Sequence, residues 1–84
     1  MHSRRFGRPV VLTHHARQRM QEREVSAAEV LEIIEGGTVR HKDERRAWIY
    51  REFPERLDNL LCVAVLLDDA IIIKTIMNHW EVSP

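Results

Sequence analysis

The segment THHARQRMQER, residues 13–23, holds the side chains best suited to chemistry: two adjacent histidines and three arginines. On an α-helix with about 100° per residue, His15, Arg19 and Arg23 form a stripe that climbs from the edge of the apolar side toward its middle. An arginine directed inward must meet a carboxylate, backbone carbonyls or an anion, because an unpaired buried charge is costly. Arginine binds phosphate through paired hydrogen bonds, and histidine moves protons near neutral pH. The stripe therefore predicts an anion site.

The same stripe also has a structural interpretation. Arg23 would then join the helix to a loop, or to an acid such as Glu52 or Asp58. Arg19 would stack on an aromatic ring such as that of Trp48. The histidine near the helix start would be a capping or packing residue. The sequence leaves both interpretations open.

Charge is distributed unevenly along a chain whose net charge is zero, with 13 basic and 13 acidic residues. Up to and including Arg23 there are six basic residues and one acid, a balance of +5, so the remaining seven basic and twelve acidic residues give −5. This asymmetry suggests that the N-terminal arm and first helix face an anion such as a phosphate backbone. Internal pairing between the two halves explains it equally well.

Two helices are expected in the first half of the chain. The first covers residues 14–24, with Thr13 as its N-cap. The second begins after Ser26, which forms a capping box with Glu29, and it stops at Gly36-Gly37.

The second half has the period and composition of β-strands. Strands are expected over residues 38–42, 46–53, 60–67 and 70–78. The first pair is joined by a polar turn at Asp43-Glu44 and the last pair by a tight turn at Asp68-Asp69, while residues 54–59 form a loop. We therefore expect a single α+β domain over residues 1–84, with two N-terminal helices packed on a three- to four-stranded antiparallel sheet. Residues 1–10 are expected to form a basic N-terminal arm.

Composition excludes several classes of protein. Hydrophobic residues make up 44% and charged residues 31%, and no apolar run approaches the length of a membrane span. The single Cys62 excludes an internal disulfide framework and is expected to be a small buried side chain, which indicates a cytoplasmic protein. His14 and His15 are neighbours that point about 100° apart on a helix, so no metal site is expected. No cofactor is expected either.

The motif residues also carry a resemblance. The segment LTHHARQRMQEREVS (residues 12–26), followed by an acidic helix and a last strand with IIIKTI (residues 71–76), resembles a family of small prokaryotic domains of unknown function. Its members open with a T-x-HA-x-x-R-M-x-x-R-x-[IV]-S pattern and close with a Val/Ile-rich strand. The similarity runs from about residue 11 to residue 78. That family has been grouped by fold with the RelE-like and barnase-like ribonucleases, whose toxin members are metal-independent and paired with antitoxins.

The resemblance implies a metal-independent ribonuclease of toxin type that cleaves RNA phosphodiesters. Such cleavage needs a base for the 2′-hydroxyl proton, cations for the charge that grows on the phosphate, and an acid for the leaving oxygen. His15 is the expected base or acid, with Arg19 and Arg23 as phosphate clamps. Lys74 or His79, from the last strand and the segment after it, is the expected opposite partner.

Further basic residues are expected to contact the nucleic acid: Arg4, Arg5, Arg8, Arg17 and Arg51. Four of them belong to the arm and the first helix, and Arg51 corresponds to the basic residues that RelE-like toxins carry on the sheet.

The alternative is a non-catalytic module that binds nucleic acid or protein, and the zero net charge favours it. Either way, the strands expected over residues 60–67 and 70–78 are apolar on both faces. Two short helices cannot easily cover both faces. We therefore expect a homodimer mate or an antitoxin-like protein on the second sheet face.

Overall fold

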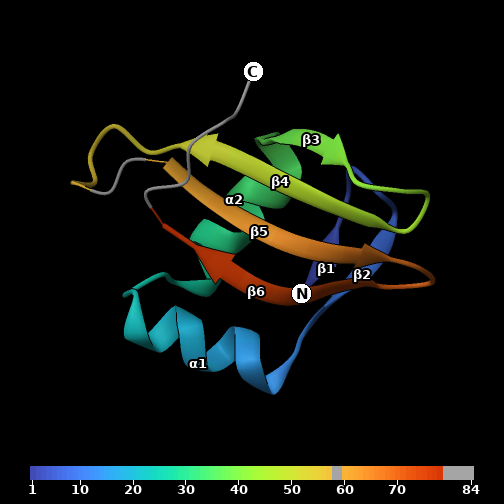
Figure 1. The fold of residues 1–84 in the computed structure, drawn as a ribbon, viewed down its shortest axis with the longest axis horizontal. Coiled ribbons are helices and arrows are strands. Elements are labelled where there is room, and N and C mark those ends of the chain that lie inside the picture. The colour runs from blue at the N-terminus through green and yellow to red at the C-terminus, as the bar shows by residue number, and fades with distance from the viewer. Residues whose placement is uncertain (58–59, 79–84) are drawn as a thin grey trace.

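The computed structural model describes residues 1–57 and 60–78 (Figure 1). Its elements, in chain order, are β1 (His2–Ser3), β2 (Arg8–Leu12), α1 (His14–Glu22), α2 (Ala27–Gly36), β3 (Thr38–His41), β4 (Arg46–Glu52), β5 (Leu60–Leu67) and β6 (Ile71–Met77). α1 packs mainly on β6, and α2 lies behind the sheet against β4 and β5. Within the described ranges, neither helix is long and apolar enough to cross a membrane.

The sheet corrects the expected architecture. It has six strands in the order β1-β2-β6-β5-β4-β3. β2 and β6 run parallel, whereas the other neighbours are antiparallel. The expectation of a three- to four-stranded antiparallel sheet is therefore wrong in both strand number and strand direction. The two helices and the four strands of the second half lie where the sequence predicts them.

Two strands were not predicted, β1 and β2, and both begin within residues 1–10, the expected basic arm. The longer of them is β2. Arg8 and Pro9 shorten its apolar part to three residues, which is too little for a period-2 signal. Its partner is far away in the chain, with Val10 opposite Ile71 and Leu12 opposite Ile73. Because this pairing is non-local, no turn sequence next to β2 indicates that it forms a strand.

Local signals fix the beginnings of both helices, as predicted. The hydroxyl of Thr13 accepts a hydrogen bond from the Ala16 amide at 3.1 Å. Ser26 and Glu29 form the reciprocal capping box, with donor–acceptor distances of 3.1 and 2.9 Å. These bonds satisfy amides that the first helical turn leaves without an intrahelical partner.

α1 ends one turn before α2 begins, and the reversal depends on Glu24. This residue has φ 53°, in the left-handed region where an L side chain costs about 1–2 kcal/mol. Its amide donates to the carbonyl of Gln21 at 3.4 Å, and the Val25 amide donates to the carbonyl of Met20 at 2.9 Å. This is the hydrogen-bond pattern of a Schellman motif, in which the residue after the turn packs back onto the helix. Val25 accordingly lies in the core.

One hydrophobic core lies between the helices and the sheet. α2 contributes Val30, Ile33 and Ile34, all fully buried. α1 contributes the buried Ala16, and Met20 packs against the core from its edge. The sheet contributes alternate residues of its three longest strands: Ala47, Ile49, Leu61, Val63, Val65, Ile71, Ile73 and Ile76. The alternation follows from the two-residue period of a strand.

A β-bulge interrupts that period on β6. Val65 lies opposite Ile73, but the preceding Ala64 lies opposite Thr75, so Lys74 is the extra residue on β6. A bulge changes the direction in which the following side chains point. The residue after Thr75 therefore faces the core again, and Lys74 remains exposed on the other side.

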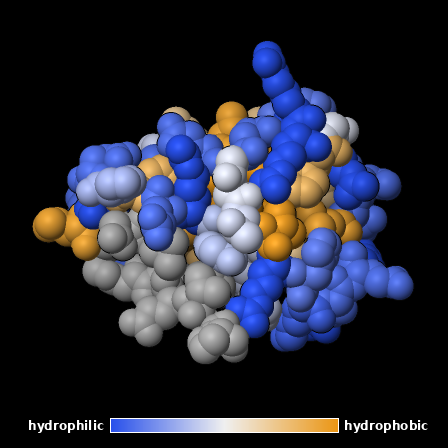
Figure 2. All heavy atoms as spheres, turned by 90° about the horizontal axis from the view of Figure 1, so that it is seen from above, coloured by the Kyte–Doolittle hydropathy of each residue, from blue (hydrophilic) through white to orange (hydrophobic). Residues whose placement is uncertain are grey.

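The face of the sheet turned away from α2 is called the open face here. It is formed by the residues that alternate with the core positions: Val11, Arg40, Lys42, Arg46, Trp48, Tyr50, the buried Cys62, Ala64, Leu66, Ile72, Lys74 and Thr75. Viewed from above, where β3 and β4 lie, the surface of the molecule is mainly hydrophilic around a smaller hydrophobic area (Figure 2).

The sheet curls around α2, so that both of its ends reach that helix. The carboxylate of Glu35 near the end of α2 accepts hydrogen bonds from the amides of Arg4 and Arg5 at 2.8 and 2.9 Å. At the other end of the sheet, β3 follows α2 directly after Gly37. The N-terminal segment is therefore tied to the C-terminus of α2.

Candidate functional site

The stripe predicted on α1 does not lie together as one group. His15 is exposed, and its Nε2 accepts a hydrogen bond from Arg19 Nε at 3.5 Å. Arg19 Nη1 also forms an ion pair with Glu22 at 2.6 Å. These side chains lie on the solvent side of the helix, where the charge of Arg19 is partly neutralised by its own neighbour.

Arg23 forms a hydrogen bond to a strand of the sheet. β2 pairs with β6 only as far as Ile73, so the carbonyls farther along that edge of β6 need other donors. Thr13 supplies its amide and its hydroxyl to the carbonyl of Ile73, at 3.3 and 2.9 Å. The guanidinium of Arg23 donates to the carbonyl of Ile76. Both ends of α1 thus supply hydrogen-bond donors to the edge of β6. Of the partners considered for an inward arginine, Arg23 has a backbone carbonyl.

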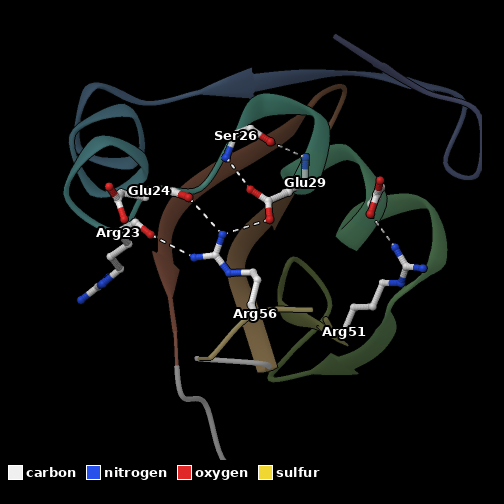
Figure 3. A network of polar contacts seen from close by, with 7 residues as sticks. Arg23, Glu24, Ser26, Glu29, Arg51 and Arg56 are labelled. Atoms are coloured by element: carbon white, nitrogen blue, oxygen red, sulfur yellow. Dashed lines mark hydrogen bonds and ion pairs between the residues drawn. The ribbon is translucent and has the colours of Figure 1, made fainter. Parts of the chain in front are cut away.

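Arg56, which was not among the predicted site residues, holds three segments together (Figure 3). Its guanidinium donates to the carbonyls of Arg23 and Glu24 at 3.1 and 3.0 Å, and to the carboxylate of Glu29 at 3.0 Å. Its side chain is only 18% exposed. Burial alone raises the pKa of Glu29, but hydrogen bonds from the Ser26 amide and from Arg56 outweigh it and hold the pKa below its usual value. The only sequence signal was a single arginine in a segment that reads as a loop.

The arginines predicted to contact nucleic acid divide into two groups. Arg5 Nη1 donates to the carbonyls of Ile34 and Gly37 at 3.2 and 2.6 Å, which caps the end of α2. Arg51 forms an ion pair with Glu32 at 2.9 Å, drawn in Figure 3. The remaining three are exposed: Arg4, Arg8 and Arg17. Part of the N-terminal positive charge is therefore used inside the fold.

A hollow of about 190 Å³ lies on the open face and includes one predicted site residue, Lys74. Its lining is formed by Lys42, Arg46, Ala47, Trp48, Ala64, Val65, Leu66 and Lys74. The walls are mainly apolar, and three of the eight lining residues are cationic. The other predicted residue at the end of β6, His79, lies outside the described residues.

The cations around the hollow differ in their contacts. The Arg46 side chain forms a hydrogen bond and an ion pair with Asp43, each at 2.6 Å, in the turn between β3 and β4. Lys42 Nζ lies 5.9 Å from the centre of the Trp48 ring, within the range of a cation–π contact. In the described part of the chain, neither Lys42 nor Lys74 forms an ion pair through its ammonium group. Two cations at the hollow are therefore available for an anionic ligand.

The Asp43 carboxylate fixes the side chain of Arg46. Hydrogen bonds from the amides of Arg46 and Arg45, and then from the Arg46 side chain, lower its pKa from 3.8 to about 2. Asp43 is therefore ionised at neutral pH. The polar turn that the sequence predicts at Asp43-Glu44 is confirmed. In addition, the turn positions the Arg46 side chain at the hollow.

Among residues 1–57 and 60–78, no group of three or more histidine, cysteine or acidic side chains is arranged to hold a metal ion. Cys62 is fully buried, as predicted, and burial raises the pKa of its thiol to about 12. A thiol with so high a pKa carries almost no thiolate at neutral pH.

The hollow offers binding chemistry for a ligand that has both flat apolar groups and negative charge. Its indole can stack on a ring, its lysines can contact phosphates, and its small side chains leave space. The sequence placed Trp48 and Lys74 on strands but gave no sign that they share a hollow with Lys42 and Arg46. Finding the hollow from the sequence would require the register of three neighbouring strands and the position of the bulge, in addition to the alternation within each strand.

The comparison with protein families covers most of the chain. The family model of DUF4258, a domain of unknown function, matches residues 12–78, a range that includes every residue lining the hollow. Comparisons with curated proteins and with solved structures found no match. The expected membership in a family of domains of unknown function is confirmed, while the relationship to RelE-like and barnase-like ribonucleases stays a prediction. The chain thus belongs to the DUF4258 family of domains of unknown function.

Proposed function

We propose that the open face of the sheet binds single-stranded RNA. The observation that carries this proposal is the hollow in which Trp48 lies among Lys42, Arg46 and Lys74. Proteins that bind single strands combine cations along the backbone path with aromatic rings on which bases stack. The open face has both, on a β-sheet.

Charge at the hollow supports an anionic ligand such as RNA over a basic or apolar protein partner. Among the residues that the structure describes, its lining contains three cations and no acid, although the chain as a whole has zero net charge. A local excess of positive charge attracts a phosphate backbone even when the net charge is zero. Arg46 is paired with Asp43, as Arg19 is with Glu22 and Arg51 with Glu32, so the positive charge available at the hollow comes from Lys42 and Lys74.

The test is the salt dependence of RNA affinity. We expect a fluorescein-labelled single-stranded RNA of twelve nucleotides to bind in an anisotropy titration, with an affinity that falls as salt rises. Lys42→Gln and Lys74→Gln should each weaken binding and reduce the slope of log affinity against log salt by about 0.7, the value for one phosphate contact on a single strand.

Arg17→Gln is the matched control, because Arg17 is exposed on α1 and belongs to the other predicted surface. It should leave the affinity and the slope unchanged. A loss of binding in Arg17→Gln with none in Lys74→Gln would move the site to α1 and contradict the proposal. The same mixtures, run on a denaturing gel, also test the cleavage that the sequence predicts: shorter products that His15→Ala abolishes.

A further inference from the structure

We infer that the hollow beside Trp48 is a subsite for one unpaired RNA base, and that Ala64 makes the room for it. This inference rests on the proposed function and adds the chemical group that the hollow receives. It starts from the register of the open face, where Arg40, Trp48, Ala64 and Thr75 lie side by side on four neighbouring strands.

The hollow exists because a small side chain lies between larger ones. Ala64 ends at its methyl group, while Trp48 on one side and Lys74 on the other extend farther from the sheet. The β-bulge contributes, because it places Lys74 as an extra residue beside Ala64 instead of in the regular ladder. A larger residue in place of Ala64 would fill this space.

The size and the lining fit a base. The volume of about 190 Å³ equals that of roughly six water molecules in the liquid, which is room for a flat ring system but not for a base pair. The apolar side chains of Ala64 and Leu66 suit the ring, and the indole of Trp48 offers a stacking surface. A base that is already paired and stacked in a duplex cannot enter without being unpaired, so the subsite favours single strands.

The cations at the rim are placed for the phosphates on either side of that base. Lys42 and Arg46 come from the β3–β4 hairpin, and Lys74 comes from β6, so they approach the hollow from different strands. Lys42 lies 5.9 Å from the Trp48 ring, so a phosphate that it binds stays close to a base stacked on the indole. The hollow would therefore hold a nucleotide within a strand, with its base inward and its phosphates at the rim.

The experiment compares two ligands of equal charge: an RNA of eight uridines, and an abasic ribose-phosphate strand of the same length. We expect the protein to bind the uridine strand about tenfold more tightly, in keeping with the stacking of one base on an aromatic residue. Ala64→Leu should abolish this difference while keeping the salt slope. Ala64→Ser, which leaves the space open, should retain the difference. In a Trp80→Phe background, the uridine strand should quench the fluorescence of Trp48, and Ala64→Leu should reduce the quenching.

Each outcome bears on one proposal or on both. Equal affinity for the two strands, with a normal salt slope, would overturn the base subsite and leave RNA binding intact. A retained difference in Ala64→Leu would also overturn it, provided that circular dichroism shows a folded protein. An absence of binding to either strand would overturn both proposals. A duplex of the same length that binds as tightly as the uridine strand would contradict the preference for an unpaired base.

Discussion

At the scale of single residues, several arginines of this protein have a structural role, because their guanidinium groups donate hydrogen bonds to backbone carbonyls. Arg5 caps the end of α2, Arg56 binds the carbonyls at the end of α1, and Arg23 binds β6. Carbonyls at a helix end lack intrahelical partners and carry partial negative charge, so a guanidinium is well suited to them. The sequence showed an excess of arginine but could not distinguish these structural bonds from an anion site.

Arg23 and Arg19 provide a matched pair for this distinction. Arg23→Met should lower the free energy of unfolding by about 1–2 kcal/mol, because the carbonyl of Ile76 loses its charged donor. Arg19→Met removes only a surface ion pair on the same helix and should change the free energy of unfolding by less than about 0.5 kcal/mol. Urea unfolding followed by circular dichroism measures both. Equal effects of the two substitutions would contradict the structural role of Arg23.

At the scale of elements, the junction between α2 and β3 shows how two adjacent glycines differ in purpose. A Cβ on Gly37 would lie 2.7 Å from the carbonyl oxygen of Tyr50 and would also collide with that of Ile33. A Cβ on Gly36 would meet only the side chain of Arg51, at 3.9 Å. Both glycines read as a helix stop in the sequence, but only Gly37 allows the close approach of β4 to the end of α2.

The two alanine substitutions should therefore act in opposite directions. Gly37→Ala should destabilise the protein by about 1–3 kcal/mol, the usual cost of overpacking. Gly36→Ala should stabilise it by up to about 1 kcal/mol, because alanine favours the helical conformation over glycine. Thermal and urea unfolding of both variants test this. A Gly37→Ala variant as stable as Gly36→Ala would show that the junction can relax.

At the scale of the whole molecule, two carboxylates join segments that are distant in the chain. Glu35 binds the amides after β1, and Glu29 binds Arg56 in the loop after β4. A third carboxylate, that of Asp43, acts locally and organises the β3–β4 turn. The pKa of each of these three carboxyl groups is held below its usual value. Because a lowered pKa favours the folded protein only while the group is ionised, the fold should weaken in acid.

The pH dependence can be assigned to one group by substitution. The pKa of Asp43 is about 2 in the folded protein, against an ordinary value of 3.8, so its stabilisation is complete above about pH 4 and is lost as the pH falls toward 2. The difference in urea midpoint between pH 6 and pH 2.5 should be smaller in Asp43→Asn than in the unchanged protein. Asp69→Asn, in the other hairpin turn, is the control. If Asp43→Asn kept the full acid dependence, the assignment would be wrong.

The open face bears on assembly as well. Its apolar side chains Leu66 and Ile72 are half-buried, and Val11, which lies beside Ile72 on β2, adds an exposed hydrophobic residue to the same face. The partner protein that the sequence predicts for this face stays a prediction. If RNA occupies the hollow, a protein on the same face would compete with it.

Features that depend on neighbours in the chain could be predicted from the sequence alone. Thr13 and Ser26 begin the helices through bonds to amides three residues away, and the strands of the second half follow from their own apolar runs and turns. Three features could not be predicted without the fold: β2 pairs with β6, Arg23 bonds a strand, and Trp48 and Lys74 line one hollow. Those pairings join residues that are far apart in the chain, and their geometry is set by sheet order and a bulge that no local pattern contains.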